Sequence, residues 1–249
     1  MSQQRTYLFP FQLPSVIVRV LALAIAIGSL FLLPVHADTP VTLPKTEDAG
    51  EAYLDRLIFF GESTTTHLRA RGGLPADRIW ADASGTRMLS PRTAHDPIVY
   101  PPTQESLTLA QACAKAQPEY LVLSFGLNGI VGFANNPNRY LSCYERLIDD
   151  IRAASPNTKI ILQTVYPVAR ADSFSVDTDT LNQYICTIND LLPQLASQRN
   201  DVRIADTASI LRDGCGRLRA ELADTDGIHL LPAAYTEILS YLRTHAWQF

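Results

Sequence analysis

The sequence predicts an α/β fold in which helices cover both faces of a parallel sheet. Short runs of apolar residues recur along the chain, and each run is nearly continuous rather than alternating. Continuous apolar runs are typical of strands that are buried on both faces. Segments with helical periodicity separate these runs, and such alternation is typical of a doubly wound α/β sandwich. In this kind of fold, ligands bind beyond the C-terminal ends of the strands.

The N-terminal segment differs from the rest of the chain. It carries Arg5 and Arg19 but no acidic residue, followed by an apolar run over residues 20–33 and then Pro-Val-His-Ala. This pattern resembles a secretory signal peptide, residues 1–37, that is cut after Ala37. The alternative is an uncleaved N-terminal anchor, for which the apolar run is short. We therefore expect a periplasmic or extracellular protein, attached to a membrane only if residues 1–37 are retained.

The remaining chain has the composition of one globular domain. Residues 38–52 are polar, include Pro40 and Pro44, and are predicted to form a linker before a domain over residues 53–249. The whole chain is 47% hydrophobic and 18% charged, with a formal net charge of −4. Removal of the two N-terminal arginines makes it more acidic still. This acidity argues against a nucleic-acid partner, which requires a basic face.

All four cysteines lie in the part of the chain that we expect to be exported, where an oxidising compartment would allow two disulfides. Sequential pairing is one of three possible connectivities, and buried free thiols are the alternative. The spacing contains no Cys-x-x-Cys, which argues against a zinc site. The cysteines are Cys113, Cys143, Cys186 and Cys215.

Strands and helices are predicted in alternation from residue 56 onward. The predicted strands cover residues 57–60, 78–81, 120–125, 159–165 and 202–205. The clearest helical patterns run over 139–154 and 181–192, and Pro193 is expected to kink or interrupt the second. Pro232 is expected to open the last helix.

Two segments show neither the apolar runs of strands nor the periodicity of helices. Residues 86–104 contain four prolines, and residues 169–179 form a polar stretch after the fourth predicted strand. Both should emerge at the sheet edge where ligands bind. They are therefore candidates for substrate contacts, although plain surface loops are an equally good interpretation.

A serine follows the first predicted strand directly, in Gly61-Glu62-Ser63. At a strand-to-helix turn, the hydroxyl of Ser63 would lie at the N-terminus of a helix, where free N–H groups stabilise an oxyanion. This is a suitable place for a nucleophile. It is also an ordinary place for a helix-capping serine, so further groups are needed to decide.

Two histidines are candidates for a base near this serine. Asp226 precedes His229 by three residues in a glycine-containing turn, from which its carboxylate can reach the histidine's own ring. His67, one helical turn after Ser63, is the rival. We interpret His229 as the base and His67 as a residue that packs beside it.

Two further residues are candidates for oxyanion donors. Asn128 ends the third predicted strand in Gly-Leu-Asn-Gly, and its side-chain amide can donate. Gly85 follows the second predicted strand and can offer a backbone N–H where a side chain would crowd the site. Both are also common turn formers.

These four motifs, in this order, resemble the SGNH hydrolases, also called GDSL esterases and lipases. The resemblance covers residues 56–246. It implies a three-layer α/β/α sandwich with five parallel strands in flavodoxin-like order. It further implies a catalytic triad of Ser63, Asp226 and His229, and an oxyanion hole formed by the backbone N–H groups of Ser63 and Gly85 and the side chain of Asn128. No metal or cofactor is implied.

The sequence departs from this family at two positions. Glu62 replaces the aspartate of the usual Gly-Asp-Ser, and Gly129 replaces the second acid of Gly-x-Asn-Asp. Neither change removes a catalytic atom, but both should affect turn geometry and substrate choice. The implied activity is hydrolysis of small acyl esters, for example O-acetyl groups on cell-wall or extracellular glycans. An acyltransferase with the same triad and a non-catalytic glycan-binding module are the alternatives.

Overall fold

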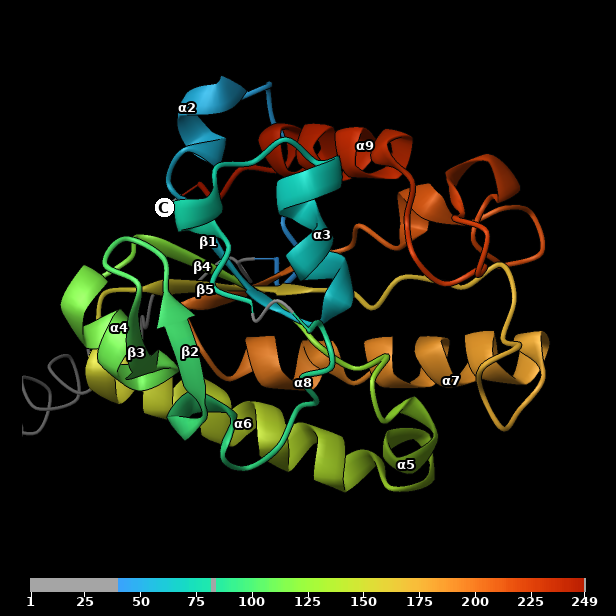
Figure 1. Cartoon of the computed structure of the whole chain (residues 1–249), viewed down its shortest axis with the longest axis horizontal. Coiled ribbons are helices and arrows are strands. Elements are labelled where there is room, and N and C mark those ends of the chain that lie inside the picture. Colours follow the sequence, from blue (N-terminus) through green and yellow to red (C-terminus); the bar gives the residue numbers. More distant parts are fainter. Residues whose placement is uncertain (1–39, 82–83, 249) are drawn as a thin grey trace, which may run out of the picture. The chain divides into compact units, whose positions relative to one another are not determined.

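Among the residues that the computed structural model describes, 40–81 and 84–248, four parallel strands form the central sheet (Figure 1). The predicted segment 1–37 and the start of the predicted linker lie outside these residues. The strand order is β1-β4-β5-β6, and all three pairings are parallel. The strands are β1 (Leu57–Gly61), β4 (Tyr120–Ser124), β5 (Lys159–Gln163) and β6 (Val202–Ala205).

Helices cover both faces of this sheet, as the continuous apolar runs predict. In Figure 1, α2, α3 and α9 lie on one side of the strands and α4, α6, α7 and α8 on the other. Two buried hydrophobic clusters fill the spaces between the layers. The helices are α2 (Gly50–Leu54), α3 (Ser63–Arg71), α4 (Leu109–Ala116), α5 (Ile130–Asn135), α6 (Pro137–Ala154), α7 (Thr178–Asn189), α8 (Leu192–Ser197) and α9 (Pro232–Thr244). The three-layer α/β/α architecture is confirmed.

The second predicted strand, residues 78–81, is reduced to one residue pair. Ile79 forms a single parallel bridge with Phe59, and the N–H of Trp80 donates to the carbonyl of Phe59 over 2.9 Å. A short 3-10 turn, Ala76–Arg78, leads directly into this bridge. The chain therefore lies beside β1 at the position expected in a flavodoxin-like order, but the pairing is too short to form a strand.

Residues 40–52, predicted as a linker, are attached to the other edge of the sheet. Thr42 forms a parallel bridge with Ile204 of β6, and Leu43 donates its N–H to Ile204. Leu43 is buried, and α2 packs against α9. The polar composition concealed these contacts because Leu43 is the only residue from 40 to 52 that is fully buried.

The proline-rich segment 86–104 contains a strand that was not predicted. β2 (Pro97–Tyr100) pairs antiparallel with β3 (Glu105–Thr108). Ile98 and Tyr100 are buried, whereas Pro97 and Val99 are exposed. Pro97 is tolerated because it occupies the first position of the strand. The prolines on either side concealed this short alternating pattern.

The late helices agree with the sequence pattern. α6 spans the predicted helix 139–154, the chain between α7 and α8 breaks just before Pro193, and Pro232 begins α9. None of the helices within residues 40–81 and 84–248 has both the length and the apolarity needed to cross a membrane. The four cysteines are free thiols, so the possible sequential disulfides are not formed.

Candidate active site

Ser63 lies where β1 passes into α3. β1 ends at Gly61, the buried Glu62 follows in extended conformation, and Ser63 is the first residue of α3. The carbonyl of Glu62 accepts the N–H groups of Thr65 and Thr66, which closes the first helical turn. The N–H of Ser63 belongs to this turn, for which the helix itself supplies no acceptor. The hydroxyl of Ser63 is therefore placed at the positive end of the helix dipole.

The structure brings Ser63, His229 and Asp226 together. His229 Nε2 lies 3.0 Å from Ser63 Oγ, and His229 Nδ1 lies 2.5 Å from Asp226 Oδ2. Because a carboxylate accepts hydrogen bonds, Nδ1 carries the proton and Nε2 can accept one from the Ser63 hydroxyl. The geometry is that of a nucleophile, a base and a carboxylate that orients the base.

Asp226 is held in its ionised form by the loop that carries it. Burial would raise its pKa, but the N–H groups of Ile228 and His229 and the His229 ring lower the pKa of Asp226 to about 2. The other carboxylate oxygen, Oδ1, accepts both backbone N–H groups at 2.9 Å. The same side chain thus shapes the turn and contacts the imidazole.

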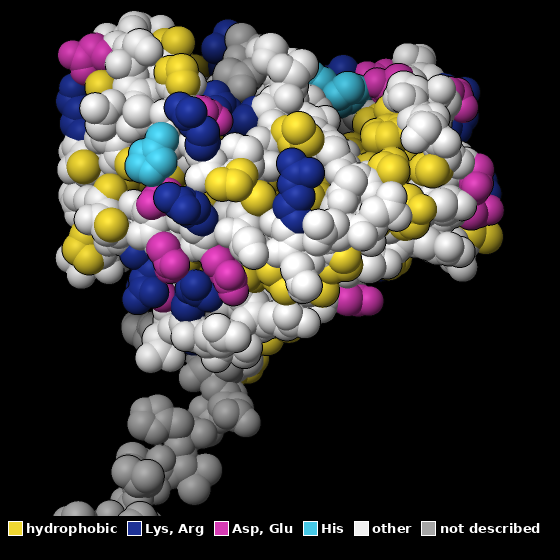
Figure 2. Space-filling view, turned by 90° about the horizontal axis from the view of Figure 1, so that it is seen from below, with side chains coloured by type: hydrophobic (Ala, Val, Ile, Leu, Met, Phe, Trp, Pro, Cys, Tyr) yellow, Lys and Arg dark blue, Asp and Glu magenta, His cyan; other side chains and the backbone are white. Residues whose placement is uncertain are grey.

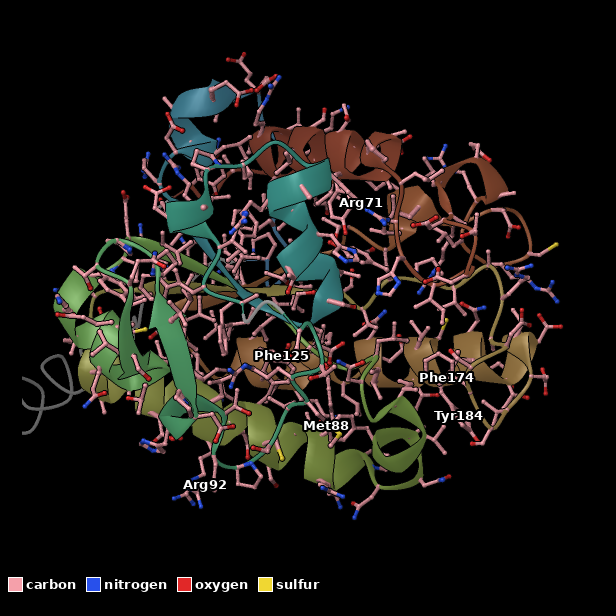
Figure 3. All side chains as sticks on the ribbon, viewed as in Figure 1. Arg71, Met88, Arg92, Phe125, Phe174 and Tyr184 are labelled. Carbon is pink, nitrogen blue, oxygen red and sulfur yellow. The ribbon has the colours of Figure 1, made fainter. Side chains whose placement is uncertain are left out.

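Two side chains, Arg71 and Tyr235, tie this loop and the helix after it to α3. Arg71, in the last turn of α3, donates to the carbonyl of Leu230 over 2.6 Å and pairs with Asp224 at 2.7 Å. Figure 3 shows Arg71 at the end of α3 that faces this loop. Tyr235 of α9 donates its hydroxyl to the carbonyl of Thr64 over 2.9 Å. The elements carrying Ser63 and His229 are therefore joined on both sides of the histidine.

Glu62 holds the loop that contains Asn128. Its carboxylate accepts the N–H of Gly126 over 2.8 Å and the N–H of Asn128 over 3.1 Å. Burial raises the pKa of Glu62 to about 8, although the backbone N–H bonds oppose that shift. The residue that replaces the expected aspartate thus reaches across to the next strand's loop, in addition to shaping its own turn.

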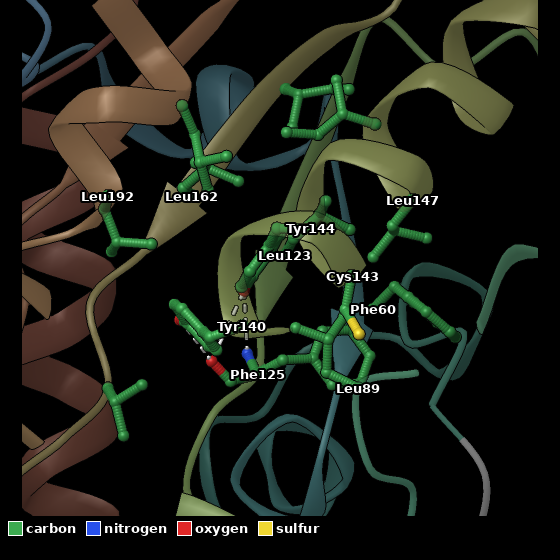
Figure 4. Packing of buried hydrophobic residues seen from close by; sticks show 14 of the residues in the cluster. Phe60, Leu89, Leu123, Phe125, Tyr140, Cys143, Tyr144, Leu147, Leu162 and Leu192 are labelled. Carbon is green, nitrogen blue, oxygen red and sulfur yellow. Dashed lines mark hydrogen bonds between the residues drawn. The ribbon is translucent and has the colours of Figure 1, made fainter. Parts of the chain in front are cut away.

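Two tyrosines of α6 hold the same loop from the other side (Figure 4). Tyr140 donates to the carbonyl of Phe125 over 3.1 Å, and the N–H of Phe125 donates to the hydroxyl of Tyr144 over 3.2 Å. Both tyrosines are fully buried. Because burial removes these hydroxyls from water, their bonds to the loop are costly to break.

Gly85 and Asn128 lie side by side next to Ser63. A Cβ atom on Gly85 would lie 2.7 Å from both Cα and Cβ of Ser63, and Gly85 has a φ of +64°. Only glycine fits this approach without strain. The amide nitrogen of Asn128 donates to the carbonyls of Gly85 and Arg87, at 3.1 and 2.9 Å. Both amide hydrogens of Asn128 already take part in hydrogen bonds. The amide can therefore donate to a substrate oxygen only when one of these two bonds is broken.

These residues line a cavity of about 420 Å³. Of the remaining lining residues, Thr86, Met88 and Phe174 belong to the two segments flagged for substrate contacts, and the others are neighbours of Gly85 and Asn128 in the sequence. Ser84 and Thr86 share a hydrogen bond of 2.8 Å at one edge. The lining residues are Ser63, Ser84, Gly85, Thr86, Met88, Leu127, Asn128, Gly129, Phe174 and His229.

His67 packs against His229 and does not reach Ser63 by any contact seen among the described residues. The centroids of the two imidazole rings are 4.7 Å apart, with the ring planes tilted by 54°. Burial and the neighbouring His229 and Arg71 lower the pKa of His67. On its other side His67 lines a second cavity of about 480 Å³, between α3 and the β2–β3 hairpin. No cluster of histidine, cysteine and acidic side chains within 40–81 and 84–248 is arranged to hold a metal ion.

The fold is similar to those of several solved structures. A Streptococcus pneumonia protein, described provisionally as a platelet activating factor, is 18% identical, with a TM-score of 0.53 over 89% of this chain and 97% of that one. A carbohydrate esterase family 3 protein from Talaromyces cellulolyticus is 14% identical, with a TM-score of 0.51 over 75% and 93% of the two chains. A lipase from a goat rumen metagenome is also 14% identical, with a TM-score of 0.50 over 77% and 97%. At these identities the similarity demonstrates the fold alone.

Sequence comparison identifies the family. No curated protein matches the chain. A family model described as the GDSL-like lipase/acylhydrolase family matches residues 59–236, which is most of the chain and includes all the residues that surround Ser63. The chain belongs to the GDSL-like lipase/acylhydrolase family, whose members hydrolyse esters.

Proposed function

We propose that this protein is a serine esterase that works through an acyl-enzyme. The observation that carries the proposal is the 3.0 Å separation between Ser63 Oγ and His229 Nε2, with Asp226 on the opposite ring nitrogen. Hydrogen-bond contact between a nucleophile and an oriented base is the geometric requirement for covalent acyl transfer.

In the proposed reaction, Ser63 attacks the ester carbonyl while His229 takes the hydroxyl proton. The N–H groups of Ser63 and Gly85 and the amide of Asn128 stabilise the negative oxygen that forms. His229 then gives the proton to the departing alcohol, leaving the acyl group on Ser63. Water, activated by the same histidine, releases the acid. Asp226 keeps the imidazole in the required tautomer throughout.

The proposed substrates are small acyl esters in an exported, periplasmic or extracellular, setting. O-acetyl groups on cell-wall or extracellular glycans are a candidate source, because one protein of similar fold is described as a carbohydrate esterase. Transfer of the acyl group to a second alcohol would use the same triad. A non-catalytic glycan-binding role would leave the close Ser63–His229 contact without a purpose.

Turnover of a p-nitrophenyl ester series, from acetate to octanoate, tests the proposal. We expect the purified wild type to hydrolyse at least one ester and to be labelled by a fluorophosphonate at Ser63. Ser63→Ala should abolish both. If the wild type is no faster than Ser63→Ala on every ester and is not labelled, the esterase proposal fails. Adding glycerol or an oligosaccharide as acceptor separates transfer from hydrolysis.

A further inference from the structure

Met88 is an exposed apolar side chain at the mouth of the candidate active site. Among the described residues, only Met88 and Val99 are large hydrophobic side chains with high exposure, 46% and 60%. Met88 lines the cavity that contains Ser63, whereas Val99 lines the separate cavity beside the β2–β3 hairpin. Met88 is therefore apolar surface left uncovered next to the nucleophile.

Two more apolar side chains, Leu127 and Phe174, line the same cavity. Leu127 directly precedes Asn128, and Phe174 comes from the long loop after β5. In Figure 3, Met88 and Phe174 both lie below α3, with Phe174 beside α7. On the face seen in Figure 2, hydrophobic side chains gather at the upper right beside a histidine, and charged side chains cluster at the lower left. The three side chains come from three segments and line one cavity, and we call them its apolar wall.

The position of Met88 depends on the absence of a side chain at residue 129. A Cβ atom on Gly129 would lie 2.4 Å from Sδ of Met88. Gly129 also has a φ of +86°, which disfavours any other residue. Gly129 stands where Gly-x-Asn-Asp motifs carry an acid, so the substitution both makes room for Met88 and removes a carboxylate from the wall.

We propose that Met88, Leu127 and Phe174 form a binding site for an apolar acyl chain longer than acetyl. The proposal rests on the proposed function, because it assumes that Ser63 accepts the acyl group. Its substrate class is esters of short to medium-length fatty acids. It therefore predicts a different acyl preference from that of an enzyme specialised for O-acetyl groups.

We assign the wall to the acyl chain rather than to the alcohol because His229 must give its proton to the departing alcohol. His229 has to protonate the departing alcohol, so the alcohol lies on the His229 side of Ser63. Met88 lies instead against Gly129, next to Asn128 and the carbonyl groups that bind its amide. The acyl chain extends from the carbonyl carbon away from the leaving group, which directs it toward this end of the cavity.

Chain length should raise the rate through burial of methylene groups. One fully buried methylene contributes enough for about a fourfold increase in kcat/KM. The cavity is open on one side, so we expect about a two- to threefold increase for each added methylene until the wall is covered. Polar neighbours are not expected to interfere, since Ser84 and Thr86 already bond to each other.

A pair of isomeric esters separates the two sides of the substrate. Ethyl hexanoate and hexyl acetate have the same atoms, but carry the long chain on the acyl and the alcohol side, respectively. Relative to ethyl acetate, we expect kcat/KM of the wild type to rise by about tenfold or more for ethyl hexanoate and by less than threefold for hexyl acetate. The reverse order would assign the wall to the alcohol and overturn the proposal.

Variants of Met88 test the wall itself. Met88→Gln keeps the length of the side chain but makes it polar, and should lower the ratio of hexanoate to acetate kcat/KM by about threefold or more. Met88→Leu should keep that ratio. Val99→Ala removes the other exposed apolar side chain and should leave the ratio unchanged.

The outcomes separate this proposal from the proposed function. If acetate is the best acyl group and Met88→Gln leaves the ratio unchanged, the wall does not bind the acyl chain, although esterase activity lost in Ser63→Ala still supports the chemistry. If no ester is turned over and Ser63 is not labelled, both proposals fail. A melting temperature for each variant verifies that a changed ratio does not come from unfolding.

Discussion

The imidazole rings of His67 and His229 are in contact, with their centroids 4.7 Å apart, but only His229 reaches the hydroxyl of Ser63. The two histidines were both candidates for the base from the sequence, because each can approach the serine in principle. The contact with Asp226 distinguishes them further, since His229 has a carboxylate on its second ring nitrogen. We therefore expect the two residues to respond very differently to mutation.

His229→Ala should lower kcat by about 10⁴-fold or more, because the hydroxyl of Ser63 loses its proton acceptor. His67→Ala should retain kcat within about tenfold, since it removes only a packing contact. Steady-state kinetics on the best p-nitrophenyl ester give both values. A larger loss in His67→Ala than in His229→Ala would reverse the assignment of the base.

Gly85→Ala should lower kcat by about 100-fold or more, because its Cβ would lie 2.7 Å from Ser63 and force the nucleophile to move. Gly132→Ala is the matched control. Gly132 lies inside α5, its Cβ would meet nothing within 4 Å, and the exchange should leave kcat unchanged while favouring the helix slightly. Equal activity in the two variants would show that the close approach of Gly85 to Ser63 is unimportant.

Asn128→Ala should lower kcat by about 10²- to 10³-fold through loss of an oxyanion donor. The carbonyls of Gly85 and Arg87 also lose their partner, so a decrease in melting temperature is expected as well. Asn136→Ala serves as a comparison, because Asn136 caps α6 and should cost about 1 kcal/mol of stability without lowering kcat. A normal kcat in Asn128→Ala would remove this side chain from the oxyanion hole.

Glu62→Gln should change how stability depends on pH. The pKa of Glu62 is raised to about 8 by burial, so the folded protein holds this proton more tightly than the unfolded chain. The corresponding stability is fully present below pH 4.5 and is lost as the pH rises toward 8. The free energy of unfolding of the wild type, measured with urea at pH 5 and pH 8, should fall by on the order of 4 kcal/mol more than that of Glu62→Gln. Parallel pH profiles for the two proteins would contradict this prediction.

The architecture could be predicted from the sequence because burial determines where apolar residues occur along the chain. Strands that are covered on both faces require nearly continuous apolar runs, and those runs located all four strands of the sheet. The hairpin β2–β3 was missed because it is short, covered on one side and bracketed by prolines. Residues 78–81 have the composition of a strand, but their pairing with β1 is limited to the single bridge between Ile79 and Phe59.

The part of the site that could be predicted consists of residues at the end of a strand or the start of a helix. Ser63, Gly85, Asn128 and His229 each follow or precede a recognisable strand or helix, so their meeting at one sheet edge could be expected. The positions of the motifs do not reveal which distant residues a side chain bonds to. The bonds from Glu62 to the Asn128 loop, and from Arg71 to Leu230, join residues 66 and 159 positions apart. The hydrogen bonds from the Asn128 amide likewise depend on where the carbonyls of Gly85 and Arg87 point, which the sequence does not specify.

The attachment of Arg71 and Tyr235 to both sides of the His229 loop has a consequence for how this enzyme can change. Ser63 and His229 are held together by these contacts, so substrate binding need not bring them together. The side chains of Met88 and Phe174 take no part in these bonds, although the loop of Phe174 is itself joined to the His229 loop, because the N–H groups of Ala169 and Arg170 donate to the carbonyl of Gly227. Replacement of these two side chains can therefore alter which ester is accepted while the Ser63–His229 contact stays intact, and new specificities can arise without passing through an inactive intermediate.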